Sequence, residues 1–127
     1  MNVIRKSMVI VSMLLLASIA LAAENVKLNG YIIDNMCGGM HAKDANAEEV
    51  VKHHKKSCAL MDGCKESGYA VFANGKLYKL DEGGNQKVVE LLKKSKSERG
   101  FAVQVEGSVE GDTITVSSIS ETAPEKK

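Results

Sequence analysis

Alternating apolar and polar positions predict a chain built mainly from short strands. Residues 26–34 (VKLNGYIID) alternate in this way and are rich in β-branched side chains, which is typical of a strand. Residues 69–73 (YAVFA) and 76–80 (KLYKL) are two further short runs that we interpret as strands, joined by Asn74-Gly75. Both central residues of a type I′ turn need positive φ, so an Asn-Gly pair between two such runs predicts a β-hairpin.

The second half of the chain predicts one helix followed by a second hairpin. Residues 86–96 place several apolar side chains on one side of a helix, and residues 81–85 are interpreted as a polar turn before it. Alternation begins again at Phe101 and continues to Ile119, interrupted by a turn at residues 111–112. Five strands with a helix between the third and the fourth indicate a mainly β fold, a small five-stranded OB-like barrel. An open α+β sandwich is the alternative.

The segment after the first strand, residues 35–67, has no strand pattern and is interpreted as an insertion. Asn46 followed three residues later by Glu49 is typical of a helix start. We expect this helix to run to Ser57 or on to Met61, because Gly63 is the next residue that commonly ends a helix.

The first residues of the chain have the three parts of an export signal. Arg5 and Lys6 precede an apolar stretch at 8–21, and residues 20–22 (ALA) match the small-x-small pattern of a cleavage site. The apolar stretch is shorter than the roughly 20 residues that span a bilayer. We therefore expect residues 1–22 to be a cleaved signal peptide of bacterial type, which makes the mature protein periplasmic or secreted.

The mature chain is expected to be one domain, residues 23–119, followed by a flexible tail, residues 120–127. The whole chain has 17 basic and 16 acidic residues, and cleavage removes two of the basic ones. A nearly neutral domain lacks the basic footprint of nucleic-acid binding and the polybasic surface of a membrane-bound protein. We expect no nucleic-acid partner and no membrane contact after cleavage.

Every cysteine, histidine and methionine of the mature chain lies between residues 36 and 64. Thiolate, thioether and imidazole groups are the soft and borderline ligands that favour copper and zinc. Three cysteines supply most of a four-ligand tetrahedral set. The predicted metal ligands are Cys37, Cys58 and Cys64, with His41 and His54 next and Met61 last.

Two local patterns support this ligand set. His54, Cys58 and Met61 are spaced i, i+4 and i+7, so they share one stripe if the predicted helix continues that far. Asp34 stands three residues before Cys37 and is expected to cap the turn there. Its alternative role is to accept a hydrogen bond from a ligating histidine.

Other interpretations of these residues stay open. An exported domain meets oxidising conditions, so two of the three cysteines can form a structural disulfide that leaves one odd thiol. The methionines can be ordinary core filler. There is no C-x-x-C motif, no C-x-x-C-H motif and no nucleophile motif. No catalytic residue is assigned, and no enzymatic activity is expected.

Two motifs resemble those of a group of short exported bacterial proteins of unassigned activity. The first is D-x-x-C-G, here residues 34–38, and the second is C-A-L-M-x-x-C-x-x-S-G-Y, here residues 58–69. The resemblance extends to a terminal hairpin at 105–116, and the C-terminal half is similar to bacterial OB-fold periplasmic proteins. The second likeness implies a fold and no function.

These patterns together predict a small exported metal-binding protein that acts as a carrier, buffer or sensor of copper or zinc. Its expected partners are the metal ion and another periplasmic protein. The alternative is a module without metal, stapled by a disulfide, that serves thiol redox chemistry or protein interaction.

Overall fold

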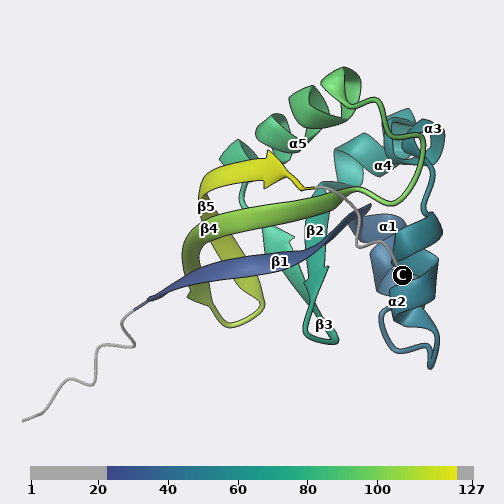
Figure 1. Ribbon diagram of the computed structural model, residues 1–127. Coiled ribbons are helices and arrows are strands. Elements are labelled where there is room, and N and C mark those ends of the chain that lie inside the picture. Colours follow the sequence, from purple (N-terminus) through teal and green to yellow (C-terminus); the bar gives the residue numbers. More distant parts are fainter. Residues whose placement is uncertain (1–22, 123–127) are drawn as a thin grey trace, which may run out of the picture.

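Five strands close into a barrel in the computed structural model, which describes residues 23–122 (Figure 1). Their spatial order is β1-β2-β3-β5-β4, and every neighbouring pair is antiparallel except β3 with β5. The OB-like barrel with a helical insertion after its first strand is confirmed, and the open sandwich is wrong because, within the described residues, every strand pairs with two others and the sheet has no free edge strand. The strands are β1 (Glu24–Asp34), β2 (Tyr69–Ala73), β3 (Lys76–Leu80), β4 (Ala102–Glu110) and β5 (Thr113–Glu121).

Both predicted hairpins are confirmed. Asn74 and Gly75 join β2 to β3 with φ of 53° and 73°, as a type I′ turn requires. Gly111, with a φ of 65°, lies in the turn between β4 and β5. The Asn-Gly turn signal located the first hairpin, whose strand β2 is buried along its whole length, and alternation located the second.

Strand β1 pairs with two strands, β4 and β2, and ends where the insertion begins. Residues 24–31 pair with β4, and residues 31–34 pair with β2. Gly30 lies where β1 passes from one partner to the other, and a Cβ built there would lie 2.1 Å from the Phe72 carbonyl oxygen. The absence of a side chain at Gly30 allows this close approach, which directs the last residues of β1 towards the helices.

Helix α5 (Glu82–Lys94) begins earlier than the sequence predicts. Asp81 is its N-cap, and Asp81 Oδ1 accepts hydrogen bonds from the backbone N–H of Gly84 and of Val116, each at 3.1 Å. The polar residues that were interpreted as a turn therefore form the first helical turn, whose free N–H groups favour such a cap. Val88 and Leu92 lie on the buried face of the helix and join the barrel core.

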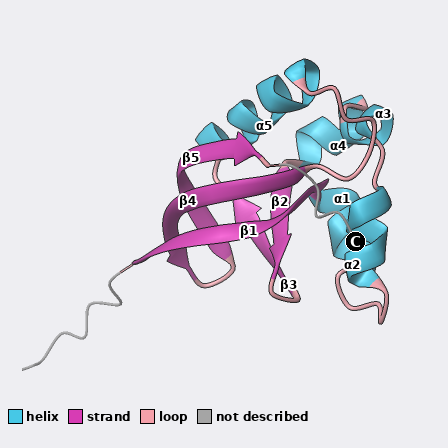
Figure 2. Ribbon diagram, in the orientation of Figure 1, coloured by secondary structure: helices cyan, strands magenta, loops and turns pink. Residues whose placement is uncertain are grey.

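Four short helices make up the insertion and gather where β1 ends (Figures 1 and 2). The single helix predicted from Asn46 to Ser57 or Met61 is wrong. His54 and Lys55 have extended backbones, and this segment pairs with residues 98–100 through the bonds Lys56 N–H to Glu98 O and Gly100 N–H to His54 O. The helices are α1 (Asn35–His41), α2 (Ala47–His53), α3 (Lys56–Ala59) and α4 (Asp62–Ser67).

The last of these helices also differs from the sequence prediction at its ends. Met61 has an extended backbone with ψ of 144°, and α4 begins directly after it. Gly63 lies inside α4 and does not end a helix. Gly68 follows α4 with a φ of 79°, a conformation that favours glycine, and leads into β2.

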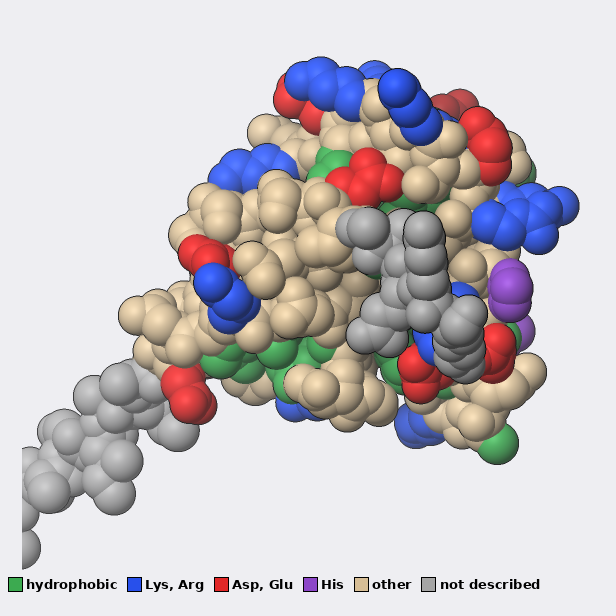
Figure 3. All heavy atoms as spheres, viewed as in Figure 1, with side chains coloured by type: hydrophobic (Ala, Val, Ile, Leu, Met, Phe, Trp, Pro, Cys, Tyr) green, Lys and Arg blue, Asp and Glu red, His purple; other side chains and the backbone are tan. Residues whose placement is uncertain are grey.

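The predicted signal peptide, residues 1–22, lies outside the described residues. The predicted tail begins too early, because Ser120 and Glu121 belong to β5. Among residues 23–122 no helix has the length and apolar character needed to cross a bilayer. On the face drawn in Figure 3, basic side chains over α5 are interspersed with acidic ones, in keeping with the near-neutral charge.

Candidate metal centre

The three cysteines converge with Asp34 at the junction of the barrel and the insertion. The Sγ atoms of Cys37, Cys58 and Cys64 and a carboxylate oxygen of Asp34 all lie within 4.8 Å of one another. The four residues come from β1, α1, α3 and α4, so the group exists only when all four elements are packed together. This Asp34–cysteine cluster can hold a metal ion.

Asp34 positions the first cysteine. Asp34 Oδ1 accepts a hydrogen bond from the backbone N–H of Cys37 at 2.9 Å and thereby caps α1. Gly38 follows, buried against the barrel, where a Cβ would lie 3.1 Å from Ile33 Cγ2 and 3.2 Å from a Leu77 methyl carbon. The predicted cap is confirmed, and the small residue after Cys37 lets the first turn of α1 lie close to the barrel.

The second oxygen of Asp34 engages a histidine. Asp34 Oδ2 and His54 Nε2 are 2.7 Å apart, and both side chains are buried. A carboxylate only accepts hydrogen bonds, so the His54 Nε2–H group donates. Asp34 therefore accepts from a histidine and caps the turn at the same time, and it is itself a member of the cluster.

Two further contacts fix the helices that carry the other cysteines. The buried Tyr69 hydroxyl donates to the Ala59 carbonyl at the end of α3 at 2.6 Å, which ties β2 to the helix that carries Cys58. Asn35 Nδ2 donates to the Ser67 carbonyl at 2.8 Å and joins the start of α1 to the end of α4. Sequence reasoning missed Tyr69 and Asn35 because neither is a metal-ligating residue and both act through long-range contacts.

The environment of the cluster favours protonated thiols in the absence of a cation. Burial, followed by the charge of Asp34, raises the pKa of Cys37 to about 12 and the pKa of Cys64 to about 11. Burial, again with Asp34, raises the pKa of Tyr69 to about 12. Asp34, the thiols and Tyr69 all become negative when they ionise, and they lie close together in a partly buried site. A bound cation would compensate this negative charge.

Three predicted ligands, His41, His54 and Met61, are not members of the Asp34–cysteine cluster. His41 Nδ1 pairs with Asp44 Oδ2 at 2.8 Å at the far end of α1. Met61 is 60% exposed, and it does not share a helical stripe with His54 and Cys58 because the helix is broken between them. The ligand roles of His41, His54 and Met61 stay predictions.

The interpretation of the methionines as core filler is wrong. Met36 is 50% exposed and Met40 is 63% exposed, and Met61 is similar. They are the exposed large hydrophobic side chains of the described residues. Core packing therefore does not explain their placement.

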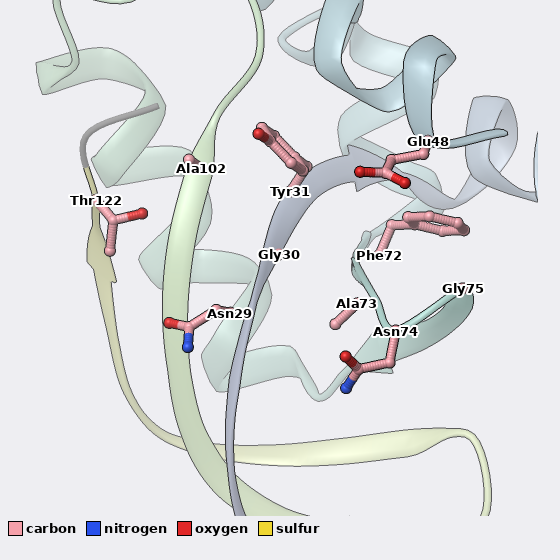
Figure 4. Close-up of a pocket in the computed structure, with 10 residues that line it drawn as sticks. All are labelled: Asn29, Gly30, Tyr31, Glu48, Phe72, Ala73, Asn74, Gly75, Ala102 and Thr122. Carbon is pink, nitrogen blue, oxygen red and sulfur yellow. The ribbon is translucent and has the colours of Figure 1, made fainter. Parts of the chain in front are cut away.

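A hollow beside β1 and β2 is separate from the cluster. It has a volume of ≈ 540 Å³, and Tyr31, Glu48 and Phe72 lie at its end nearer the helices (Figure 4). The Glu48 carboxylate is paired with Lys52 Nζ at 2.7 Å. No cysteine, histidine or methionine lines this hollow.

No family model matches the chain, and neither a curated protein nor a solved structure does. The resemblance of the two cysteine motifs to short exported proteins stays a prediction, and the function is argued from the geometry of the cluster.

Proposed function

We propose that this protein is an exported metal-binding protein that holds one copper or zinc ion at Asp34, Cys37, Cys58 and Cys64. It acts as a carrier, buffer or sensor of that ion outside the cytoplasm, and not as an enzyme. The observation that carries the proposal is the convergence of three thiols and one buried carboxylate from four separate elements.

The spacing of the sulfur atoms supports a metal site. Ligands placed tetrahedrally about zinc at Zn–S distances near 2.3 Å are separated by about 3.8 Å. Cys37 Sγ and Cys58 Sγ are 4.0 Å apart, close to that value and about 2 Å longer than a disulfide bond. Small shifts would bring the group onto one ion, with three sulfurs and one oxygen for zinc or the three sulfurs alone for Cu(I).

The exposure of the ligands supports a site that exchanges its ion. Cys64 is 6% exposed, whereas Cys37 and Cys58 are partly exposed. An ion can therefore enter on the side of Cys37 and Cys58 and be shielded by Cys64 and Asp34. His54 Nε2–H donates a hydrogen bond to Asp34 Oδ2, and such a bond commonly orients a carboxylate that binds a metal.

The alternative function is a thiol redox module, and the nearness of Cys37 and Cys58 favours it. Oxidation of this pair to a disulfide would leave Cys64 as the odd thiol. The raised pKa of Cys37 makes this residue a weak attacking thiol, because the attacking species in thiol–disulfide exchange is the thiolate.

The test is made on protein collected from the periplasm without chelator, with metal content and free thiols measured on one sample. We expect about one copper or zinc ion per chain and three thiols that react only after the metal is removed. Cys58→Ser should abolish retention of the ion, whereas His53→Gln, which changes an exposed histidine of the same insertion, should not. Reduced protein that takes up neither ion would overturn the proposal, and one free thiol without metal would mean a disulfide-stapled domain instead.

A further inference from the structure

The three exposed methionines are placed around the cluster. Met36 directly precedes Cys37, and Met61 is midway between Cys58 and Cys64 in the sequence. Met40 lies one helical turn after Met36 on the same face of α1. Each cysteine of the cluster therefore has a methionine within three residues along the chain.

The packing of α1 on α4 brings two of these methionines to one side of the insertion. A Cβ built at Gly63 would lie 3.8 Å from Met36 Cε, so the Met36 side chain reaches across to the start of α4. Met61 is the N-cap of the same helix, two residues before Gly63. Asn35 and Ser67 hold the other ends of the two helices together.

Exposure of these side chains needs an explanation other than packing. An apolar side chain of this size loses about 1.5–3 kcal/mol of favourable burial when it stays in water. The mature chain has three methionines, all of them are exposed, and all of them are in the metal-binding insertion. The group that distinguishes methionine from leucine is the thioether, a soft neutral ligand that suits Cu(I) and not zinc.

We propose that Met36, Met40 and Met61 form a thioether site that accepts Cu(I) at the surface and passes it to Cys37, Cys58 and Cys64. This inference rests on the proposed metal-binding function and assigns copper as the ion. The transfer is ligand exchange: thioether–copper bonds break, thiolate–copper bonds form, and the thiol protons go to solvent. Copper stays Cu(I) throughout, so no oxidant or reductant takes part.

The thioether site is tested first without the cysteines. In the Cys37→Ser/Cys58→Ser/Cys64→Ser variant, Ag(I) serves as a stable substitute for Cu(I), and the methionine methyl groups are observed by ¹³C NMR. We expect the three methyl signals to shift together and to saturate at about one ion per chain. Signals that do not move overturn the inference, whatever the cysteines bind. If this variant does not fold, the titration is made on wild-type protein whose cysteines are first saturated with Ag(I), and the methionine signals are followed as the next equivalent of Ag(I) is added.

The transfer step is tested by the rate at which reduced, metal-free protein removes Cu(I) from a coloured chelator complex. Met36→Leu/Met40→Leu/Met61→Leu keeps the apolar surface and removes the thioethers. We expect it to bind the same amount of copper at equilibrium but to load about tenfold more slowly or worse, because capture no longer precedes an intramolecular step. His53→Gln, the matched control, should load at the wild-type rate.

Two outcomes would overturn the transfer role. One is a leucine variant that loads Cu(I) as fast as wild type, which would show that the thioethers take no part in copper capture. The other is equal slowing of zinc loading, which would show that leucine alters access to the cysteines and not coordination. Wild-type protein that shows methionine shifts with Ag(I) but retains neither copper nor zinc at its cysteines would instead defeat the proposed function and leave the thioether site standing.

Discussion

At the scale of single residues, Asp34 does the most to organise the site. It is fully buried, caps α1 through one oxygen and binds His54 through the other. A buried carboxylate persists only where hydrogen bonds or a cation compensate it. Asp34 therefore joins the fold of the insertion to the chemistry of the cluster.

Asp34→Asn is expected to weaken both metal binding and folding. A carboxylate accepts at two oxygens, whereas the amide has one acceptor, so either Cys37 N–H or His54 Nε2–H would face an N–H group. We expect a loss of about 10- to 100-fold in metal affinity and of about 1–3 kcal/mol in the free energy of unfolding. Metal competition titration and urea unfolding measure the two effects.

Asp44→Asn is the control for that change, because Asp44 pairs with His41 at the exposed far end of α1. Its metal affinity should equal that of wild type. If Asp34→Asn binds metal as tightly as the control, Asp34 is not part of the metal site.

The raised pKa values predict a loss of stability at alkaline pH for reduced, metal-free protein. The pKa of Cys37 rises from 9.0 to about 12 and that of Cys64 from 9.0 to about 11, so between these limits the unfolded chain has released protons that the folded chain keeps. The free energy of unfolding must then fall as pH rises through this window. Below the window, these two thiols do not make the free energy of unfolding depend on pH. Unfolding curves between pH 8 and about 11 measure the slope, which should be smaller in Cys37→Ser/Cys64→Ser. Equal slopes would contradict the burial argument.

At the scale of elements, the sequence predicted the barrel well and the insertion poorly. Strand 26–34 is visible in the sequence because its apolar and polar side chains alternate, and strands 69–73 and 76–80 are visible because the Asn74-Gly75 turn joins two apolar-rich runs. The insertion is set by long-range bonds, such as Lys56 N–H to Glu98 O, that no local pattern reveals. The convergence of the three cysteines could be predicted from their grouping in the sequence, but the inclusion of Asp34 and the absence of a continuous helical stripe could not.

The break between α2 and α3 is predicted to depend on Gly100. Gly100 has a φ of 68° and donates its N–H to the His54 carbonyl, and a Cβ there would lie 2.4 Å from the Lys52 carbonyl oxygen. Gly100→Ala should lower the free energy of unfolding by more than about 1 kcal/mol and loosen metal binding, because His54 is held at this break.

Gly39→Ala is the matched control. Gly39 is in α1, and a Cβ there would meet nothing within 4 Å. This change should be neutral or stabilising by about 0.5–1 kcal/mol, because alanine favours helix interiors. Equal destabilisation by the two changes, measured by urea unfolding, would show that the contact at Gly100 is not what matters.

At the scale of the whole molecule, metal binding is expected to be coupled to folding. The four residues proposed as ligands belong to four elements, so the cluster is complete only in the folded chain, and an ion that binds the folded state alone stabilises it. At a free metal concentration of 100 times Kd the expected gain is about 2.7 kcal/mol. Thermal unfolding with and without zinc measures it, and Cys58→Ser should show no gain. A wild-type Tm that zinc leaves unchanged would contradict the coupling.

The coordination of the bound ion tests the central claim most directly. X-ray absorption of protein loaded with one equivalent of copper or zinc reports the atoms around the metal and their distances. We predict a shell dominated by three sulfur atoms at about 2.3 Å, and no sulfur-bound ion in Cys58→Ser. A shell of nitrogen and oxygen atoms without sulfur would place the ion elsewhere and contradict the assignment of Cys37, Cys58 and Cys64 as a metal site.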